Sequence, residues 1–189
     1  TKKASAQTGL PEGIPVTYRA GDQPNNALSL NVFNDGEVAA TGGTSGVIYA
    51  VTKNKKSKES SRINHFAHVN YSENNHTIGK LLCINGAGIM YRWLRNQSSA
   101  ESYETMNKKA SKVPVGSDGL VILPFGNGAE RMLNNLTIGS QFCNINLNQH
   151  TKAHLFRAAL EGIAFSFVYG MEILKNDEVK IKVIRAGND

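Results

Sequence analysis

The 189-residue sequence has only two cysteines, few aromatic residues and no long apolar run. Cys83 and Cys143 are too widely separated to suggest a disulfide scaffold, and their apolar surroundings suit buried free thiols in a reducing cytosol. No apolar stretch reaches about 18 residues and no signal peptide is apparent, so we expect neither membrane spanning nor secretion. These features favour a cytoplasmic protein.

The net charge of +6 is spread along the chain, with local basic clusters only at residues 53–58 and 108–112. Neither cluster has interleaved aromatic residues or a recognition motif, so we interpret them as a solvated loop and a helix face. We therefore expect no nucleic-acid partner. The 40% hydrophobic content is enough to form a core.

Four of the five histidines lie in two pairs whose spacing can place two imidazoles on one helical face. His65 and His68 are three residues apart, and His150 and His154 are four apart. Neither pair is accompanied by the glutamate of a zinc-protease motif or by cysteines at ligand spacing. We therefore expect no protein-held metal site.

Apolar positions indicate an alternating α/β chain. Strands are predicted over residues 14–18, 37–41, 46–52, 78–84, 119–124, 138–145 and 180–185, and helices over 24–33, 87–96, 100–112 and 151–175. The polar stretch from Lys53 to Asn75 is predicted to be a loop.

The helix predicted over 151–175 has the clearest periodicity. Thr151 is available as its N-terminal cap, and His154 is expected to help begin it. Gly162 and Gly170 would destabilise its interior unless they permit close packing. We therefore expect this helix to lie tightly against a sheet or another helix.

An acidic turn, Gly21-Asp22-Gln23, follows the apolar run 13–18. A carboxylate at the mouth of a strand is a candidate general base. Aspartate at a strand-to-helix turn also caps the first helical turn. From the residues alone, both interpretations of Asp22 stay open.

A second turn, Gly42-Gly43-Thr44-Ser45-Gly46, lies between two strand-like runs and predicts a hairpin tip. Glycine lets backbone N–H groups approach a ligand closely, and the two hydroxyls add donors for an anion such as phosphate. An ordinary tight β-turn fits the same residues. The strict phosphate-loop pattern with its lysine is absent.

The acidic turn followed by the Gly-Thr-Ser hairpin resembles the catalytic core of the FGGY carbohydrate kinases, nearest to their xylulose kinase members. The likeness continues through Asn85-Gly86-Ala87-Gly88 and the segments 123–131, 140–145 and 154–162. Asn144 stands where the family usually has glycine. Because asparagine tolerates positive φ better than most residues, we expect that turn to survive.

The resemblance implies an α/β fold of the actin-like ATPase, or ribonuclease H-like, type, with two lobes and ATP in the cleft between them. It assigns residues 1–35 to the last strand, catalytic turn and helix of the N-terminal lobe. Residues 36–189 would form the C-terminal lobe, cut within its adenine loop. We therefore expect a fragment that is inactive alone.

The implied reaction transfers a phosphoryl group from ATP, with Mg²⁺, to a sugar hydroxyl. D-xylulose is the first expectation, giving D-xylulose 5-phosphate; another sugar or polyol is the alternative. Asp22 would be the general base and would touch the sugar together with Gln23. The implied ATP-binding residues are Gly43, Thr44, Ser45, Gly86, Ala87, Gly88, Gly187 and Asn188.

Other assignments stay open. Arg131 fits a phosphate contact or a salt bridge equally well. A homodimer formed through an exposed strand edge is compatible with the chain. A non-catalytic nucleotide-binding or scaffolding protein of the same fold is the alternative to an enzyme. The carboxylate of Asp22 beside an intact Gly-Thr-Ser hairpin favours the enzyme.

Overall fold

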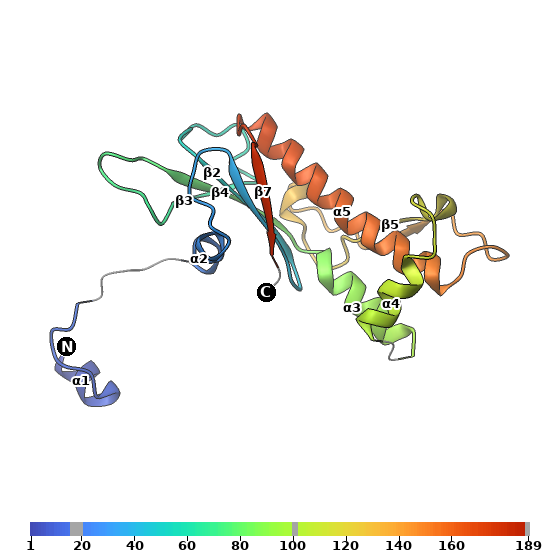
Figure 1. Ribbon diagram of the computed structural model, residues 1–189, viewed down its shortest axis with the longest axis horizontal. Coiled ribbons are helices and arrows are strands. Elements are labelled where there is room, and N and C mark those ends of the chain that lie inside the picture. Colours follow the sequence, from blue (N-terminus) through green and yellow to red (C-terminus); the bar gives the residue numbers. More distant parts are fainter. Residues whose placement is uncertain (16–20, 100–101, 188–189) are drawn as a thin grey trace.

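The structure, a computed structural model, describes residues 1–15, 21–99 and 102–187 (Figure 1). The helices are α1 (Lys2–Thr8), α2 (Asp22–Ser29), α3 (Ala87–Gln97), α4 (Tyr103–Ala110) and α5 (Lys152–Asn176), with 3₁₀ turns η1 (Ser117–Gly119) and η2 (Arg131–Leu133). The strands are β1 (Glu37–Gly42), β2 (Gly46–Thr52), β3 (Asn64–Ala67), β4 (Ile78–Ile84), β5 (Val121–Leu123), β6 (Gln141–Cys143) and β7 (Val183–Gly187). The predicted α/β class is confirmed.

A mixed five-stranded sheet has the order β3-β4-β2-β1-β7. Neighbouring strands from β3 to β1 are antiparallel, whereas β7 lies parallel to β1. The parallel connection requires a crossover, which the helical segment with α3, α4 and α5 supplies. A separate two-stranded sheet consists of β5 and β6.

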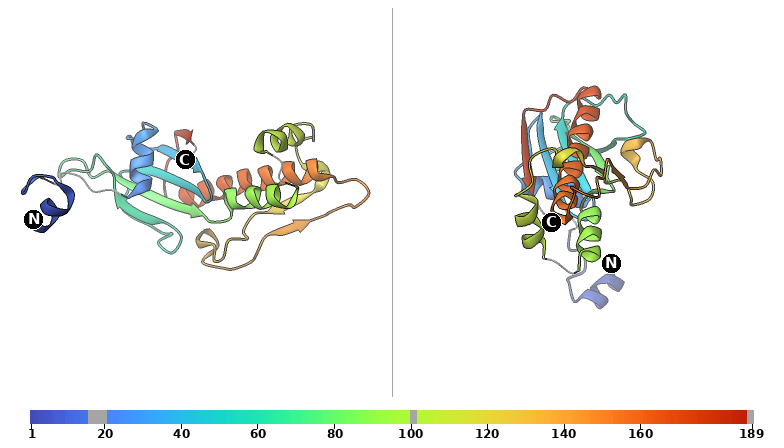
Figure 2. Two further views of the ribbon diagram at one scale, coloured as in Figure 1. Left: turned by 90° about the horizontal axis from the view of Figure 1, so that it is seen from below. Right: turned by 90° about the vertical axis from the view of Figure 1, so that its right-hand side faces the viewer.

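Helices cover both faces of the main sheet, α2 on one side and α5 on the other (Figure 2). Successive strand residues point to opposite faces, so each strand contributes to two cores. The core beneath α5 contains Val38, Ile48, Leu82, Ile173 and Leu174. The core beneath α2 contains Ala27, Val32, Ala39, Tyr49 and Leu81.

The expected close packing of α5 is confirmed at both of its internal glycines. A Cβ on Gly162 would overlap the carbonyl oxygen of Ile122, and one on Gly170 would lie 2.6 Å from Cδ1 of Ile48. The helix also begins as expected, because Thr151 precedes it and donates its N–H to Nδ1 of His154 at 3.1 Å.

Other predictions have mixed outcomes. Asn144 adopts φ of 63°, so the turn expected in place of glycine forms. The loop prediction for 53–75 is wrong at Asn64–Ala67, which forms β3 on the edge of the sheet. Helix α1 is not anticipated by the sequence, because it buries no residue and so has no apolar face. The predicted strand 14–18 falls largely outside the described residues.

A buried ion pair anchors the segment after β2. Nζ of Lys80 lies 2.7 Å from Oδ2 of Asp177, and both side chains are fully buried. The other carboxylate oxygen, Oδ1, accepts hydrogen bonds from the Ser57 hydroxyl at 3.0 Å and the Glu59 N–H at 3.1 Å. Because the pair is hydrogen-bonded on both sides, it can hold this polar segment against α5 and the sheet.

Both cysteines are free and partly buried. No helix in the described part of the chain is long and apolar enough to cross a membrane. The same residues contain no group of three or more histidine, cysteine or acidic side chains arranged to hold a metal ion.

Candidate active site

The hairpin joining β1 to β2 closes at residues 43–45, as predicted. Gly42 and Gly46 are partners in the strand register, and the N–H of Gly43 donates to the carbonyl oxygen of Ser45 at 3.0 Å. Thr44 is exposed, and a Cβ on Gly42 would meet no atom within 4 Å. The tip therefore presents backbone and hydroxyl groups to open space.

The start of α3 lies directly against this tip (Figure 1). The N–H of Ile89 donates to the carbonyl oxygen of Thr44 at 2.9 Å. A Cβ on Gly88 would overlap the carbonyl oxygen of Gly43, so the contact requires glycine. The N-terminal end of a helix carries partial positive charge, and Arg92 adds a guanidinium to the cavity beside the tip, so this junction is suited to an anion.

A cavity of about 450 Å³ opens between the tip, α3, α4 and α5. Its lining residues are Gly42, Gly43, Thr44, Gly88, Tyr91, Arg92, Tyr103, Asn107 and Leu160. Three of these, Gly43, Thr44 and Gly88, were predicted as ATP-binding residues. Tyr91 and Arg92 also line the cavity but were not predicted as site residues. They lie three and four residues after Gly88 on α3, so helical spacing from Gly88 could have identified them.

The α4 wall of this cavity is built from stacked aromatic rings. Tyr91 and Tyr103 stack with centroids 5.8 Å apart, and the Tyr91 hydroxyl donates to Oδ1 of Asn107 at 2.8 Å. The guanidinium of Arg95 lies 4.5 Å from the centroid of the Tyr103 ring. Burial raises the pKa of Tyr91 to about 12, so the phenol stays neutral and keeps its hydrogen-bond donor.

The other described residues that were predicted to bind ATP are not among the lining residues of this cavity. Gly187 pairs with Thr41 in the sheet and so lies beside the hairpin tip, while Asn188 lies outside the described residues. Ala87 is the first residue of α3 and is buried. The N–H of Gly86 donates to Oε2 of Glu130 at 3.2 Å, so that donor is already occupied.

Asp22 is the first residue of α2, with Gly21 preceding it at the N-cap position. Its Oδ1 accepts the N–H of Gln23 at 2.9 Å, so the carboxylate does contact the first helical turn. The Asp22 residue is nevertheless exposed and remains accessible to a ligand.

Three charged side chains influence the pKa of Cys83, near the end of β4. Burial raises the pKa of the Cys83 thiol, Arg131 opposes that change, and the carboxylates of Glu130 and Asp22 add to it. These three side chains therefore all act on Cys83 electrostatically. The contact observed for Arg131 itself is a hydrogen bond from its Nε to the carbonyl oxygen of Ser61 at 3.1 Å.

Buried hydrogen bonds fix the chain that leaves α2. Nε2 of His68 lies 3.0 Å from the carbonyl oxygen of Val32, and Nδ1 lies 3.1 Å from the Tyr49 hydroxyl. Because a carbonyl only accepts, Nε2 carries the proton and the neutral Nδ1 accepts from tyrosine. Burial lowers the pKa of His68, which favours this neutral form. The relay holds the exit of α2, and thereby the helix that begins at Asp22, on the sheet.

Comparison with known proteins gives these residues a family. Residues 38–187 match the C-terminal domain of the FGGY family of carbohydrate kinases. The chain belongs to this family. The match spans β1 to β7 and includes the hairpin tip, α3 and the cavity.

Named kinases are among the relatives. The chain is 30% identical to the gluconokinase of Bacillus licheniformis over 173 residues, which cover 86% of this chain and 33% of that protein. It is 27% identical to a xylulose kinase of Staphylococcus epidermidis over 176 residues, covering 93% and 34%. The chain thus spans about a third of the length of these relatives.

Solved structures give the same result for the fold. The xylulose kinase of Rhodospirillum rubrum superposes with a TM-score of 0.82 at 28% identity, covering 98% of this chain and 37% of that one. FGGY sugar kinases have an actin-like ATPase fold, so the predicted fold type is confirmed for this C-terminal lobe.

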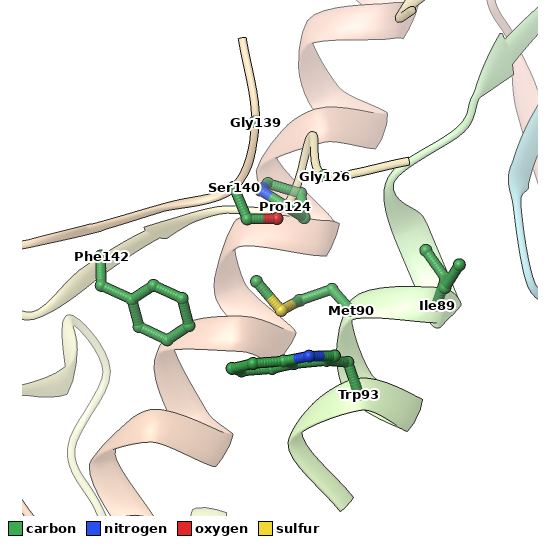
Figure 3. A pocket seen from close by; sticks show the side chains of 8 residues that line it. All are labelled: Ile89, Met90, Trp93, Pro124, Gly126, Gly139, Ser140 and Phe142. Carbon is green, nitrogen blue, oxygen red and sulfur yellow. The ribbon is translucent and has the colours of Figure 1, made fainter. Parts of the chain in front are cut away.

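A second cavity, of about 370 Å³, lies on the opposite side of α3 in this FGGY domain. It is lined by Ile89, Met90, Trp93, Pro124, Gly126, Gly139, Ser140 and Phe142. Figure 3 shows Met90 and Trp93 projecting from α3 towards Pro124 and Phe142. Because no lining residue is charged, this cavity lacks the anion-binding character of the one at the hairpin tip.

Proposed function

We propose that this segment serves as the C-terminal lobe of an ATP-dependent sugar kinase, with residues 1–35 belonging to the end of the N-terminal lobe and 36–189 to the C-terminal lobe. The observation that carries the proposal is the junction of the hairpin tip with α3. There, Gly43 and Gly88 bring two backbone segments together at the edge of one cavity. A protein in which an N-terminal lobe precedes this segment is called the two-lobe protein.

The donors around this cavity fit the phosphates of ATP. The hydroxyls and N–H groups of Thr44 and Ser45 would bind the β- and γ-phosphates, and Arg92 would add a positive charge beside them. The Tyr91–Tyr103 wall and Gly187 would border the nucleoside, with the adenine contact extending to Asn188. These donors position ATP and offset its charge, as phosphoryl transfer requires.

Mg²⁺ fits this site only as a companion of ATP. The lining residues carry N–H donors, the hydroxyls of Thr44, Tyr91 and Tyr103, and a guanidinium, but no carboxylate. Hard divalent cations prefer oxygen ligands, above all carboxylates and phosphates. Mg²⁺ would therefore be bound largely by the nucleotide phosphates, where it supplies charge neutralisation.

Asp22 would accept the proton of the attacking sugar hydroxyl. Its carboxylate is exposed at the start of α2, and the Tyr49–His68 relay fixes the exit of that helix. Gln23, the next residue, would help hold the sugar. A general base works by position first, and an anchored helix provides that position.

D-xylulose is the first candidate substrate and D-gluconate the second, because the relatives include both xylulose kinases and gluconokinases. A coupled assay of ADP release by the two-lobe protein, with D-xylulose, L-xylulose, D-gluconate and glycerol, tests the proposal. We expect ATP-dependent turnover with D-xylulose, L-xylulose or D-gluconate. We also expect the enzyme to act in the cytoplasm. ATP binding without turnover on any of a broad sugar panel would favour a non-catalytic member of the fold.

A further inference from the structure

Glu130 is a buried acid that contacts the start of α3. The residue is 1% exposed, and its Oε2 accepts the N–H of Asn85 at 2.9 Å and of Gly86 at 3.2 Å. These two N–H groups immediately precede α3. A carboxylate at this position complements the positive end of the helix dipole and makes charge-assisted hydrogen bonds.

Further hydrogen bonds tie the loop that carries Glu130 to the same turn. The side-chain amide of Asn85 donates to the carbonyl oxygen of Ala129 at 2.7 Å, and that of Asn127 donates to the carbonyl oxygen of Asn85 at 3.0 Å. A Cβ on Gly86 would overlap the carbonyl oxygen of Pro124. The turn is therefore held between this loop and the carboxylate.

The other end of this connection is the hairpin tip. Four residues beyond Asn85, the N–H of Ile89 donates to the carbonyl oxygen of Thr44, and Gly88 lies against Gly43. One turn of helix is too short and stiff to absorb a shift of its first residues. A displacement at Glu130 would therefore reach the tip.

We propose that Glu130 is a positioning residue for nucleotide phosphate binding, which acts by fixing α3 against the 43–45 tip. The proposal rests on the function proposed above, and it names a residue outside the cavity. Glu130 contacts neither the cavity nor the tip directly, so its effect passes through Asn85, Gly86 and α3.

The second carboxylate oxygen of Glu130 distinguishes this arrangement from ordinary capping. Oε1 is buried and has no hydrogen-bond partner among the described residues. Burial raises the pKa of Glu130, and the backbone N–H groups of Asn85, Gly86 and Met132 oppose that rise. A buried oxygen without a hydrogen-bond partner destabilises a fold. The fold retains this cost at the point where α3 meets the proposed phosphate site.

Amide hydrogen exchange on the 189-residue chain tests the positioning role independently of activity. In Glu130→Ala we expect the amide of Ile89 to exchange at least about tenfold faster, because its hydrogen bond to Thr44 is lost when α3 is released from the tip. Glu130→Gln, whose carbonyl oxygen can still accept the two N–H groups, should restore slow exchange. Glu172→Gln, at an exposed position on α5, is the matched control. Faster exchange confined to Asn85 and Gly86 would overturn the proposal.

Kinetics of the two-lobe protein supply the functional readout. Glu130→Ala should raise the KM for ATP about tenfold with little change in the KM for the sugar, and Glu130→Gln should restore it. Equal rises in both KM values would contradict positioning at the phosphate site. If the wild-type protein turns over no sugar, the proposed function fails, while the exchange experiment still decides whether Glu130 holds the tip.

Discussion

Ile89 donates its N–H to the carbonyl oxygen of Thr44 at 2.9 Å, joining the first turn of α3 to the tip of the β1–β2 hairpin. The two residues are 45 positions apart in the chain, and both lie in the part that matches the FGGY C-terminal domain. This hydrogen bond joins the glycine-rich hairpin tip and the glycine-containing start of α3 into one continuous surface.

Replacing Thr44 with valine should weaken ATP binding to the two-lobe protein about tenfold, because the substitution keeps the β-branched shape and removes the hydroxyl. Binding of adenosine, which has no phosphates, should change little. Calorimetry with both ligands measures the difference. Equal losses for ATP and adenosine would mean that the substitution distorts the hairpin instead.

Gly88→Ala should destabilise the 189-residue chain by about 1–3 kcal/mol, because the added methyl group would overlap the carbonyl oxygen of Gly43. Gly42→Ala is the matched control, since a Cβ there meets no atom within 4 Å. Thermal unfolding of the two variants checks this. A similar melting temperature for both would show that the tip and α3 separate easily.

Acid should destabilise the fold partly through Glu37. N–H groups of Asn34 and Phe33 bond its carboxylate and lower its pKa from 4.5 to about 2. Because the folded-state pKa is depressed, the stabilisation is present above pH 4.5 and is lost as pH falls towards 2, with a size of about 3 kcal/mol. Urea unfolding of wild type and Glu37→Gln between pH 2 and 7 should give stabilities that differ at neutral pH and converge in acid. If the difference in stability between the two proteins stayed the same from pH 2 to 7, ionised Glu37 would not be the source of the acid sensitivity.

The sequence predicts the elements whose apolar pattern is strong. Strands β2 and β4 occur where largely apolar runs indicate them, and helix α5 occurs where helical periodicity does. Strand β3 is missed because its Asn-His-Phe-Ala sequence lies at an exposed edge, so backbone pairing with β4 and not burial creates the strand.

The site is only partly predictable for a related reason. Thr44 and Gly88 stand in local motifs, but their contact depends on how the sheet brings two turns together. Tyr103 and Asn107 reach the cavity from α4 by tertiary packing. Glu130 lies in a polar loop where a charged residue indicates exposure, and its burial comes from the turn before α3.

The 189-residue chain on its own should show no sugar-dependent ATP turnover. Much of the barrier reduction in phosphoryl transfer comes from bringing two substrates together between closing lobes, and this chain covers about a third of its relatives' length. An assay with ATP and D-xylulose or D-gluconate checks the prediction. Measurable turnover by the purified chain would require a different assignment of its domains.

The most direct test of the whole account is the steady-state turnover of the two-lobe protein with Asp22→Asn. We predict that kcat falls at least about 100-fold while the affinity for ATP is nearly unchanged, because the substitution removes a general base and leaves the hairpin tip intact. Turnover above about a tenth of the wild-type value would assign Asp22 to the first turn of α2 alone and contradict the proposed mechanism.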